Sequence, residues 1–154
     1  MDINKIIAYL ILVFSFFTPS LWCKLVDLEE SEFEYMAQVI EAESDRADGC
    51  TYGKVLIGST VWNRMHSSKF KNSIRGVLDE NGQFTTTSNG KCYIKATNGS
   101  RLAVVISYIC YENRLIEDNI LFFNCVGYNG YTPYDYVGGN YFMTSGQKGE
   151  SYEH

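Results

Sequence analysis

The chain has 154 residues, with 13 basic and 18 acidic side chains and a formal net charge of −5. This length suits one ordinary domain, and the negative charge without a basic run excludes a typical nucleic-acid-binding protein. The only histidines are His66 and the terminal His154. Because a zinc hydrolase usually needs about two or three histidines, zinc chemistry is excluded as well. We therefore expect no metal, no cofactor and no nucleic-acid partner.

The first 23 residues have the composition of a secretion signal. Lys5 precedes an apolar run at 6–17, and the small residues of Thr18-Pro19-Ser20 follow it. The run is too short to cross a bilayer comfortably. We predict a cleaved signal peptide at 1–23, one domain at 24–145 and a flexible tail at 146–154, with an uncleaved membrane anchor as the alternative. The mature protein is then secreted or held in the cell envelope, away from the membrane.

The cysteines leave two interpretations open. Cys23, Cys50, Cys92, Cys110 and Cys125 are spread along the chain. In an exported domain the last four could form two disulfides. In the alternative interpretation, some of them are small buried hydrophobic residues with free thiols.

The first helix of the domain is predicted to begin near Ser31, where Ser31 and Glu34 fit a capping box. Its buried face is predicted from the helical spacing of Phe33, Met36, Ala37 and Ile40. Its opposite face is predicted to be a solvated polar stripe of Glu34, Gln38, Glu41 and Asp45.

A second helix is predicted from a Thr51 cap to about His66. It is apolar nearly all round and should be central, with Gly58 and Ser59 allowing another helix to approach closely. Residues 67–100 are expected to be irregular, and a third helix is expected at about 101–114. Two strands follow, at 120–124 and 134–143. The predicted fold class is α+β, mainly α, with a small late β element.

Glu43 departs from the polar pattern around it. Met36, Ile40 and Glu43 lie at i, i+4 and i+7, so this carboxyl ends the buried stripe. Partial desolvation raises the pKa of a carboxyl group, as a general acid working near neutral pH requires. The alternative is that the helix frays there and the side chain turns into solvent.

Six segments between about residues 33 and 143 form an ordered series of motifs. They are Met36–Glu43, Gly53–Met65 with its Asn63-Arg64 pair, Phe70–Leu78, Gly82–Thr85, Leu121–Asn124 and Gly138–Phe142. In this order they resemble the segments of bacterial cell-wall hydrolases of the spore cortex-lytic type. Asn140-Tyr141 stands where the family has a histidine-containing turn.

This resemblance implies a lysozyme-like, lytic-transglycosylase-like fold that cuts the β-1,4 bond between N-acetylmuramic acid and N-acetylglucosamine. It also implies that Glu43 is the catalytic acid, acting alone, and that peptidoglycan glycan strands are the partner of a monomeric enzyme. The residues expected to line the sugar groove are Gln83, Phe84, Thr85, Asn124 and Tyr128.

Two other classes of protein stay open at this point. One is a peptidase or amidase with Cys50 or Cys92 as nucleophile and His66 as base. The other is an inactive wall-binding module built on the same scaffold.

Overall fold

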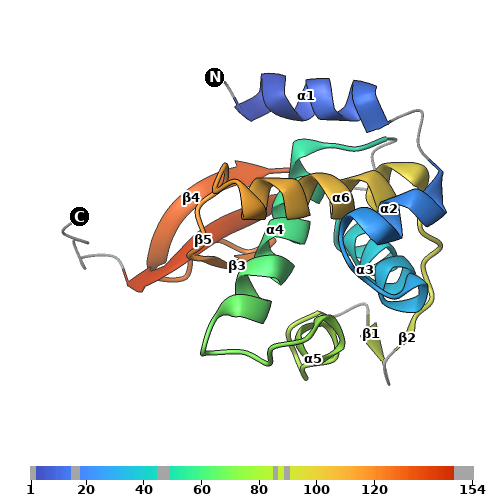
Figure 1. The fold of residues 1–154 in the computed structure, drawn as a ribbon. Helices are drawn as coiled ribbons and strands as arrows, with labels where there is room; N and C mark the ends of the chain where they lie inside the picture. Colours follow the sequence, from blue (N-terminus) through green and yellow to red (C-terminus); the bar gives the residue numbers. More distant parts are fainter. Residues whose placement is uncertain (1–2, 15–17, 45–48, 85–86, 89–90, 148–154) are drawn as a thin grey trace.

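A computed structural model describes the chain except for residues 1–2, 15–17, 45–48, 85–86, 89–90 and 148–154. Its helices are α1 (Ile3–Phe14), α2 (Pro19–Leu25), α3 (Glu30–Glu43), α4 (Tyr52–His66), α5 (Ile74–Leu78) and α6 (Asn98–Glu112). Its strands are β1 (Thr87–Ser88), β2 (Lys91–Cys92), β3 (Ile120–Asn124), β4 (Tyr131–Val137) and β5 (Asn140–Gln147). The expectation of a mainly helical domain with a small late sheet is confirmed (Figure 1).

Helix α4 is the centre of the core, as its sequence predicts. Thr51 Oγ1 accepts a hydrogen bond from Lys54 N at its start, and every residue from Gly53 to Arg64 is buried. It packs against α3, α6 and β3. A Cβ at Gly58 would collide with Ser107 on α6, so the predicted close approach is confirmed. Trp62 Nε1 donates a hydrogen bond to Ser107 Oγ at 3.0 Å, which also links α4 to α6.

The predicted helix starts need two corrections. Helix α3 begins at Glu30, and its Glu29 cap makes no side-chain hydrogen bond, so the predicted Ser31 capping box is wrong. The capping box belongs to α6 instead, where Thr97 and Ser100 each accept from the other's backbone N–H, at 3.1 and 2.9 Å. This cap starts α6 at Asn98, three residues before the predicted position. A serine serves here in place of the usual Glu or Gln.

The segments after α4 also differ from expectation. Residues 67–100 contain α5 and the short β1–β2 pair in addition to turns. The predicted strand at 134–143 is a hairpin of β4 and β5, which turns at Gly138 and Gly139 with positive φ values of 59° and 80°. The antiparallel sheet has the order β3-β5-β4, with Phe123 opposite Phe142 and Asn124 opposite Tyr141.

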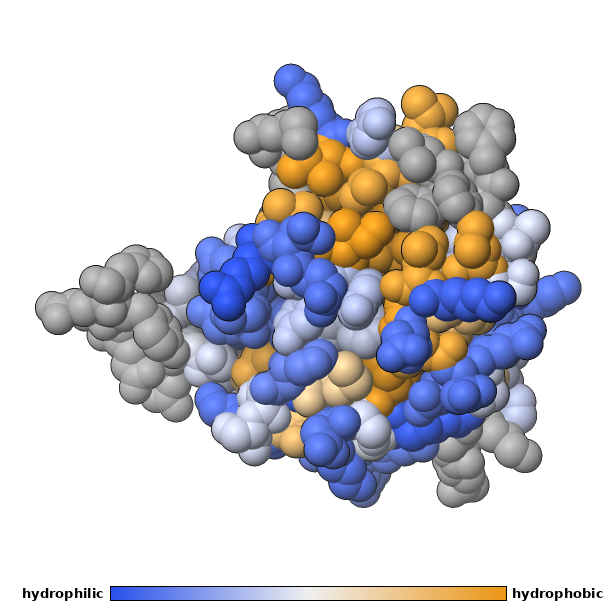
Figure 2. Space-filling view, in the orientation of Figure 1, coloured by the Kyte–Doolittle hydropathy of each residue, from blue (hydrophilic) through white to orange (hydrophobic). Residues whose placement is uncertain are grey.

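The two N-terminal helices lie on the helical body. Helix α1 lies along α6 and α2 contacts both α6 and α3 (Figure 1). Ile7 and Trp22 are buried, whereas Figure 2 shows apolar side chains gathered on the surface at this end of the molecule. Tyr9 and Leu12 are among the exposed large hydrophobic residues, at 67% and 64%. Within the described residues, no helix is both long and apolar enough to span a bilayer.

Candidate active site

Glu43 is the last residue of α3, at the point where the buried face of the helix reaches the surface. Met36 and Ile40, which precede it on that face, are completely buried, and the Glu43 side chain is half-buried. The backbone N–H of Ser44 still bonds to the Ile40 carbonyl at 3.1 Å, so the last turn of α3 is intact. The helix therefore continues to Glu43 without fraying.

The end of α3 contacts the sheet through the backbone of Glu43. Asn140 Nδ2 donates to the Glu43 carbonyl oxygen at 3.0 Å, and Asn140 is the first residue of β5. The adjoining turn packs on the start of α4, because a Cβ at Gly53 would lie only 3.8 Å from Gly138 Cα. Glu43 therefore lies at the junction of the helical body and the β4–β5 hairpin.

Glu41 is buried, and the prediction that it lies on a solvated stripe is wrong. Its Oε2 accepts from Lys54 Nζ at 2.9 Å and from Thr97 Oγ1 at 2.7 Å. Lys54 is fully buried and also donates to the Gly49 carbonyl at 3.0 Å. Burial by itself raises the pKa of Glu41, but the hydrogen bonds from Lys54 and Thr97 outweigh it and lower this pKa below its ordinary value. Glu41 is thus an ionised structural residue two positions before Glu43.

The predicted groove residues around 83–85 occupy different environments. Gln83 is half-buried in the turn that follows α5. Phe84 is only 3% exposed, and its ring packs between Phe123, with ring centroids 6.0 Å apart, and the Arg64 guanidinium at 5.3 Å. Such a ring offers a sugar almost no surface. Thr85 lies outside the described residues.

Asn124 and Tyr128 flank the turn after β3. Asn124 Oδ1 accepts from the backbone N–H groups of Val126 and Gly127, at 2.8 and 2.9 Å, and so shapes this turn. Tyr128 is half-buried and meets Tyr141 edge-on, with centroids 5.0 Å apart. The ring centroids of Tyr136 and Tyr141 are 4.4 Å apart, so the three rings form a tyrosine cluster. The sequence alone does not indicate this cluster.

This tyrosine cluster is on the sheet face that points away from Glu43. Consecutive residues of a strand point to opposite faces. Asn140 contacts the Glu43 carbonyl, so Tyr141 beside it faces the other way. The structure therefore does not bring Tyr128 onto the face of β5 that meets the end of α3.

The Asn63-Arg64 pair at the end of α4 fixes β3. Asn63 Nδ2 donates to the carbonyls of Glu117 and Ile120, at 2.9 and 3.1 Å, and Arg64 Nε donates to Leu121 O at 2.7 Å. Arg64 is buried, which lowers its pKa to about 10. The pair thus connects the central helix to the sheet.

The cysteines and His66 form no catalytic pair. All five cysteines carry free thiols, and Cys23, Cys92 and Cys110 are buried, as in the second interpretation of the sequence. Burial raises the pKa of Cys50 to about 12, which keeps it a thiol. His66 Nδ1 lies 2.9 Å from the Trp62 carbonyl oxygen, and its ring stacks on Tyr111. In the described part of the chain no contact joins His66 to a cysteine, and no His, Cys, Asp and Glu group could hold a metal.

The fold and the arrangement around Glu43 together indicate the class of protein. A mainly helical domain carries an acidic residue at the end of a buried helix, beside a small antiparallel sheet, which is a lysozyme-like arrangement. The family described as Cell Wall Hydrolase matches residues 49–137, more than half of the chain. The chain therefore belongs to the cell wall hydrolase family, and the expected enzyme class is confirmed.

Two solved structures share the fold. The catalytic domain of the Bacillus cereus SleB protein is 21% identical over 75% of this chain and 91% of that chain, with a TM-score of 0.61. The catalytic domain of the germination-specific lytic transglycosylase SleB from Bacillus anthracis is 20% identical over 75% of this chain and 96% of that chain, with a TM-score of 0.59. A search of curated protein sequences finds no significant match. The fold implied by the sequence resemblance is thus confirmed.

Proposed function

We propose that this enzyme cleaves the β-1,4 bond between N-acetylmuramic acid and N-acetylglucosamine in peptidoglycan, with Glu43 as its single general acid and base. The observation that carries the proposal is the placement of Glu43 at the end of the buried face of α3, with its carbonyl bonded to Asn140 of β5. The fold shared with a lytic transglycosylase supports the same reaction class. The family match begins at residue 49, so the role of Glu43 rests on the local sequence resemblance and on this geometry.

The chemistry needs one carboxyl group in two successive roles. Protonated Glu43 gives its proton to the glycosidic oxygen, which leaves as the 4-hydroxyl of N-acetylglucosamine. The Glu43 carboxylate then takes the proton of the muramic acid C6 hydroxyl while O6 bonds to C1, which closes a 1,6-anhydro ring. Because the attacking oxygen comes from the substrate, no second carboxylate is needed to activate water. A muramidase that uses water at this step is the alternative outcome.

The groove contacts that remain candidates are Gln83 and Thr85. Gln83 is half-buried and keeps its amide within reach of solvent. For Phe84, Asn124 and Tyr128 we propose an indirect part, since Phe84 fills the core, Asn124 shapes a turn and Tyr128 packs on Tyr141 on the other face of the sheet.

Mass spectrometry of the products from purified murein tests the reaction. A lytic transglycosylase releases fragments that end in anhydromuramic acid and are lighter by one water than the reducing ends left by a muramidase. The expected result is the anhydro product. Reducing ends would replace the transglycosylase mechanism with hydrolysis. Released peptides with intact glycan would contradict glycan cleavage, and no release at all would indicate an inactive wall-binding module.

We also propose that residues 1–23 are removed on export and that the mature enzyme acts as a monomer in the cell envelope. The composition of this segment supports the proposal, with Lys5 ahead of a short apolar run. N-terminal sequencing of the exported protein should find a start between about residues 20 and 26. An intact Met1 on membrane-bound protein would contradict it and would favour the uncleaved anchor.

A further inference from the structure

The tyrosine cluster belongs to a row of side chains that crosses the whole sheet. Tyr141 of β5 pairs directly with Tyr136 of β4 on one side and with Asn124 of β3 on the other. Directly opposed residues of antiparallel strands point to the same face. Because neighbouring strands lie about 4.8 Å apart, the row from Asn124 to Tyr136 extends over two such spacings. The sheet therefore presents a short, straight series of amide and aromatic groups on its face away from Glu43.

The rings of the cluster hold one another in place and reach solvent. The planes of Tyr136 and Tyr141 are inclined by 38°, and Tyr128 meets Tyr141 at 80°. Tyr136 is 56% exposed, and Tyr128 and Tyr141 are half-buried. Val126, in the turn that leads to Tyr128, is 80% exposed. Rings fixed in this way lose little conformational entropy when a ligand binds, so they form an effective contact surface.

This face of the sheet carries no charge of its own. Asp135 is the only charged residue between positions 119 and 147, in a chain with 13 basic and 18 acidic side chains. It pairs with the fully buried Phe142, so it lies on the opposite face from Tyr141. A nucleic acid or an anionic lipid surface requires several Lys or Arg residues. The cluster therefore suits a neutral partner.

The groups on this face match a sugar polymer. A pyranose ring has a face of C–H groups that stacks on an aromatic ring, and a rim of hydroxyl and amide groups that form hydrogen bonds. Tyrosine offers both a ring face and a hydroxyl that donates and accepts. At the other end of the row, Asn124 Oδ1 accepts from two backbone N–H groups, which fixes the orientation of the amide. The spacing of the strands is close to the length of one pyranose residue, so the row matches consecutive sugars of one chain.

We propose that the tyrosine cluster is a second glycan-binding site, which holds a neutral β-1,4-linked chain of N-acetylated sugars. That this chain is peptidoglycan rests on the proposed function. Asn140, which contacts the end of α3, and Tyr141 are consecutive and point to opposite faces of the sheet. The strand bound by the cluster is therefore a neighbour of the strand at Glu43. The site keeps the enzyme on an assembled wall, where strands lie side by side, and plays no part in the cleavage of short soluble fragments.

An NMR titration with chitohexaose, an uncharged β-1,4-linked chain of N-acetylglucosamine, tests where the glycan binds. In the wild-type protein the backbone amide signals of Tyr136 and Tyr141 should shift. Tyr136→Ser should weaken the binding followed at Tyr141 about tenfold, whereas Tyr136→Phe keeps the ring and should retain most of it. Because Tyr136 is 56% exposed, Tyr136→Ser should keep the fold. Wild-type shifts confined to residues around Glu43, or equal affinity of Tyr136→Ser and the wild type at Tyr141, would overturn the proposal.

Turnover of two forms of the substrate tests what the site does for the enzyme. On insoluble sacculi, Tyr136→Ser should raise the apparent KM about tenfold with kcat unchanged. On a soluble tetrasaccharide released from the same wall, both constants should equal those of the wild type. An equal rise of KM on both substrates, or no rise on sacculi, would contradict the proposal.

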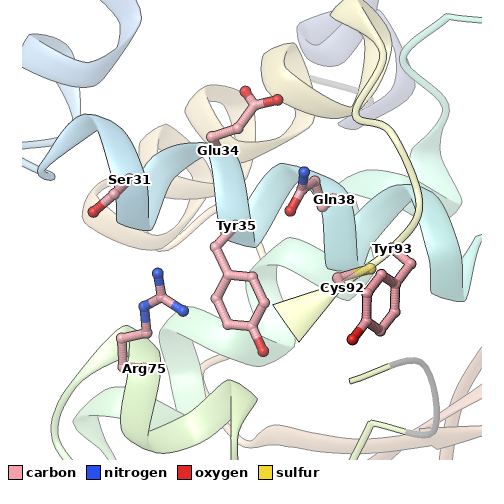
Figure 3. Close-up of a pocket in the computed structure, with 7 residues that line it drawn as sticks. All are labelled: Ser31, Glu34, Tyr35, Gln38, Arg75, Cys92 and Tyr93. Carbon is pink, nitrogen blue, oxygen red and sulfur yellow. The ribbon is translucent and has the colours of Figure 1, made fainter. Parts of the chain in front are cut away.

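Tyr93→Ser is the matched control. Tyr93 is 80% exposed and lines a pocket beside α3 and α5, in another part of the molecule (Figure 3). Its replacement removes an exposed tyrosine ring without touching the sheet, so it should change neither the titration nor the KM on sacculi. If the wild type cleaves neither substrate, the proposed function fails, and the titration still decides whether the cluster binds glycans.

Discussion

Lys54 Nζ lies 2.9 Å from Glu41 Oε2 in the interior, with the lysine side chain fully buried and the glutamate side chain 7% exposed. The pair joins the end of α3 to the first turn of α4, and Thr97 adds the start of α6 through its hydrogen bond to Glu41. Three helix ends therefore meet two residues before Glu43. This cluster fixes the direction in which α3 presents its last residue.

Lys54→Met should destabilise the fold strongly. It leaves the Glu41 carboxylate buried without its cation, and removing one partner of a buried ion pair costs about 3–5 kcal/mol. Urea unfolding measures the change. The double variant Lys54→Met/Glu41→Leu should recover most of the lost stability, because apolar residues of similar volume can replace a buried pair. Equal stability of the single variant and the wild type would contradict this account of the pair.

Glu41 should make stability depend on pH. Its pKa in the folded protein lies below the ordinary value of 4.5, so its stabilising contribution is complete above that value. The contribution is lost as the pH falls through the lower, folded-state pKa. The free energy of unfolding of the wild type should therefore fall more steeply below pH 4.5 than that of Glu41→Gln. Parallel curves would mean that Glu41 has the same pKa in both states.

The same pair explains what the sequence could not predict. Helical periodicity places Glu41 with other polar residues, and only the long-range contact with Lys54 shows that it is buried. Lys54 itself is a charged residue followed directly by the apolar residues Val55, Leu56 and Ile57, and its position in the sequence does not indicate its partner. Helical spacing predicts that Glu43 follows Met36 and Ile40 on one face, and α3 does extend to Glu43.

Capping residues and apolar runs in the sequence predicted some elements well. The limits of the other elements depend on pairing between strands. Thr51 marks the start of α4 through its own side chain, and the apolar run of β3 sets that strand's limits. The β4–β5 hairpin was missed because Gly138-Gly139 interrupts a segment that otherwise has the composition of one strand. The Tyr136–Tyr141 contact depends on the register of that hairpin, so the sequence alone did not bring these rings together.

Asn140→Ala should lower activity more than stability. It removes one hydrogen bond, which contributes about 1 kcal/mol to the fold, but this bond positions the backbone of Glu43. Because small displacements of a catalytic group lower rates greatly, we expect kcat to fall roughly tenfold. Asn72→Ala, at an exposed position, is the matched control and should keep full activity. An unchanged kcat in Asn140→Ala would show that Glu43 keeps its position without the sheet.

Gly58→Ala should disrupt the contact between α4 and α6. The added Cβ would collide with Ser107 Oγ and lie 2.8 Å from Ser107 Cβ. Overpacking of this kind costs about 1–3 kcal/mol, which thermal unfolding can measure. Adding Ser107→Gly should relieve the collision, whereas Ser107→Ala retains the Cβ and should not. Both substitutions remove the acceptor of Trp62 Nε1, so the two double variants are compared with each other and the Ser107→Gly form should be the more stable. A fully stable Gly58→Ala protein would mean that the two helices separate at little cost.

The turnover of purified murein by Glu43→Gln tests the central claim most directly. The amide keeps the size and shape of the side chain but can neither supply the proton nor take it back, so turnover should fall at least about a hundredfold. The melting temperature should change little, because the side chain is half-buried at a helix end. Glu30→Gln, an exposed acid at the other end of the same helix, is the control and should retain wild-type turnover. Full turnover by Glu43→Gln would contradict the proposed mechanism and show that another residue supplies the proton.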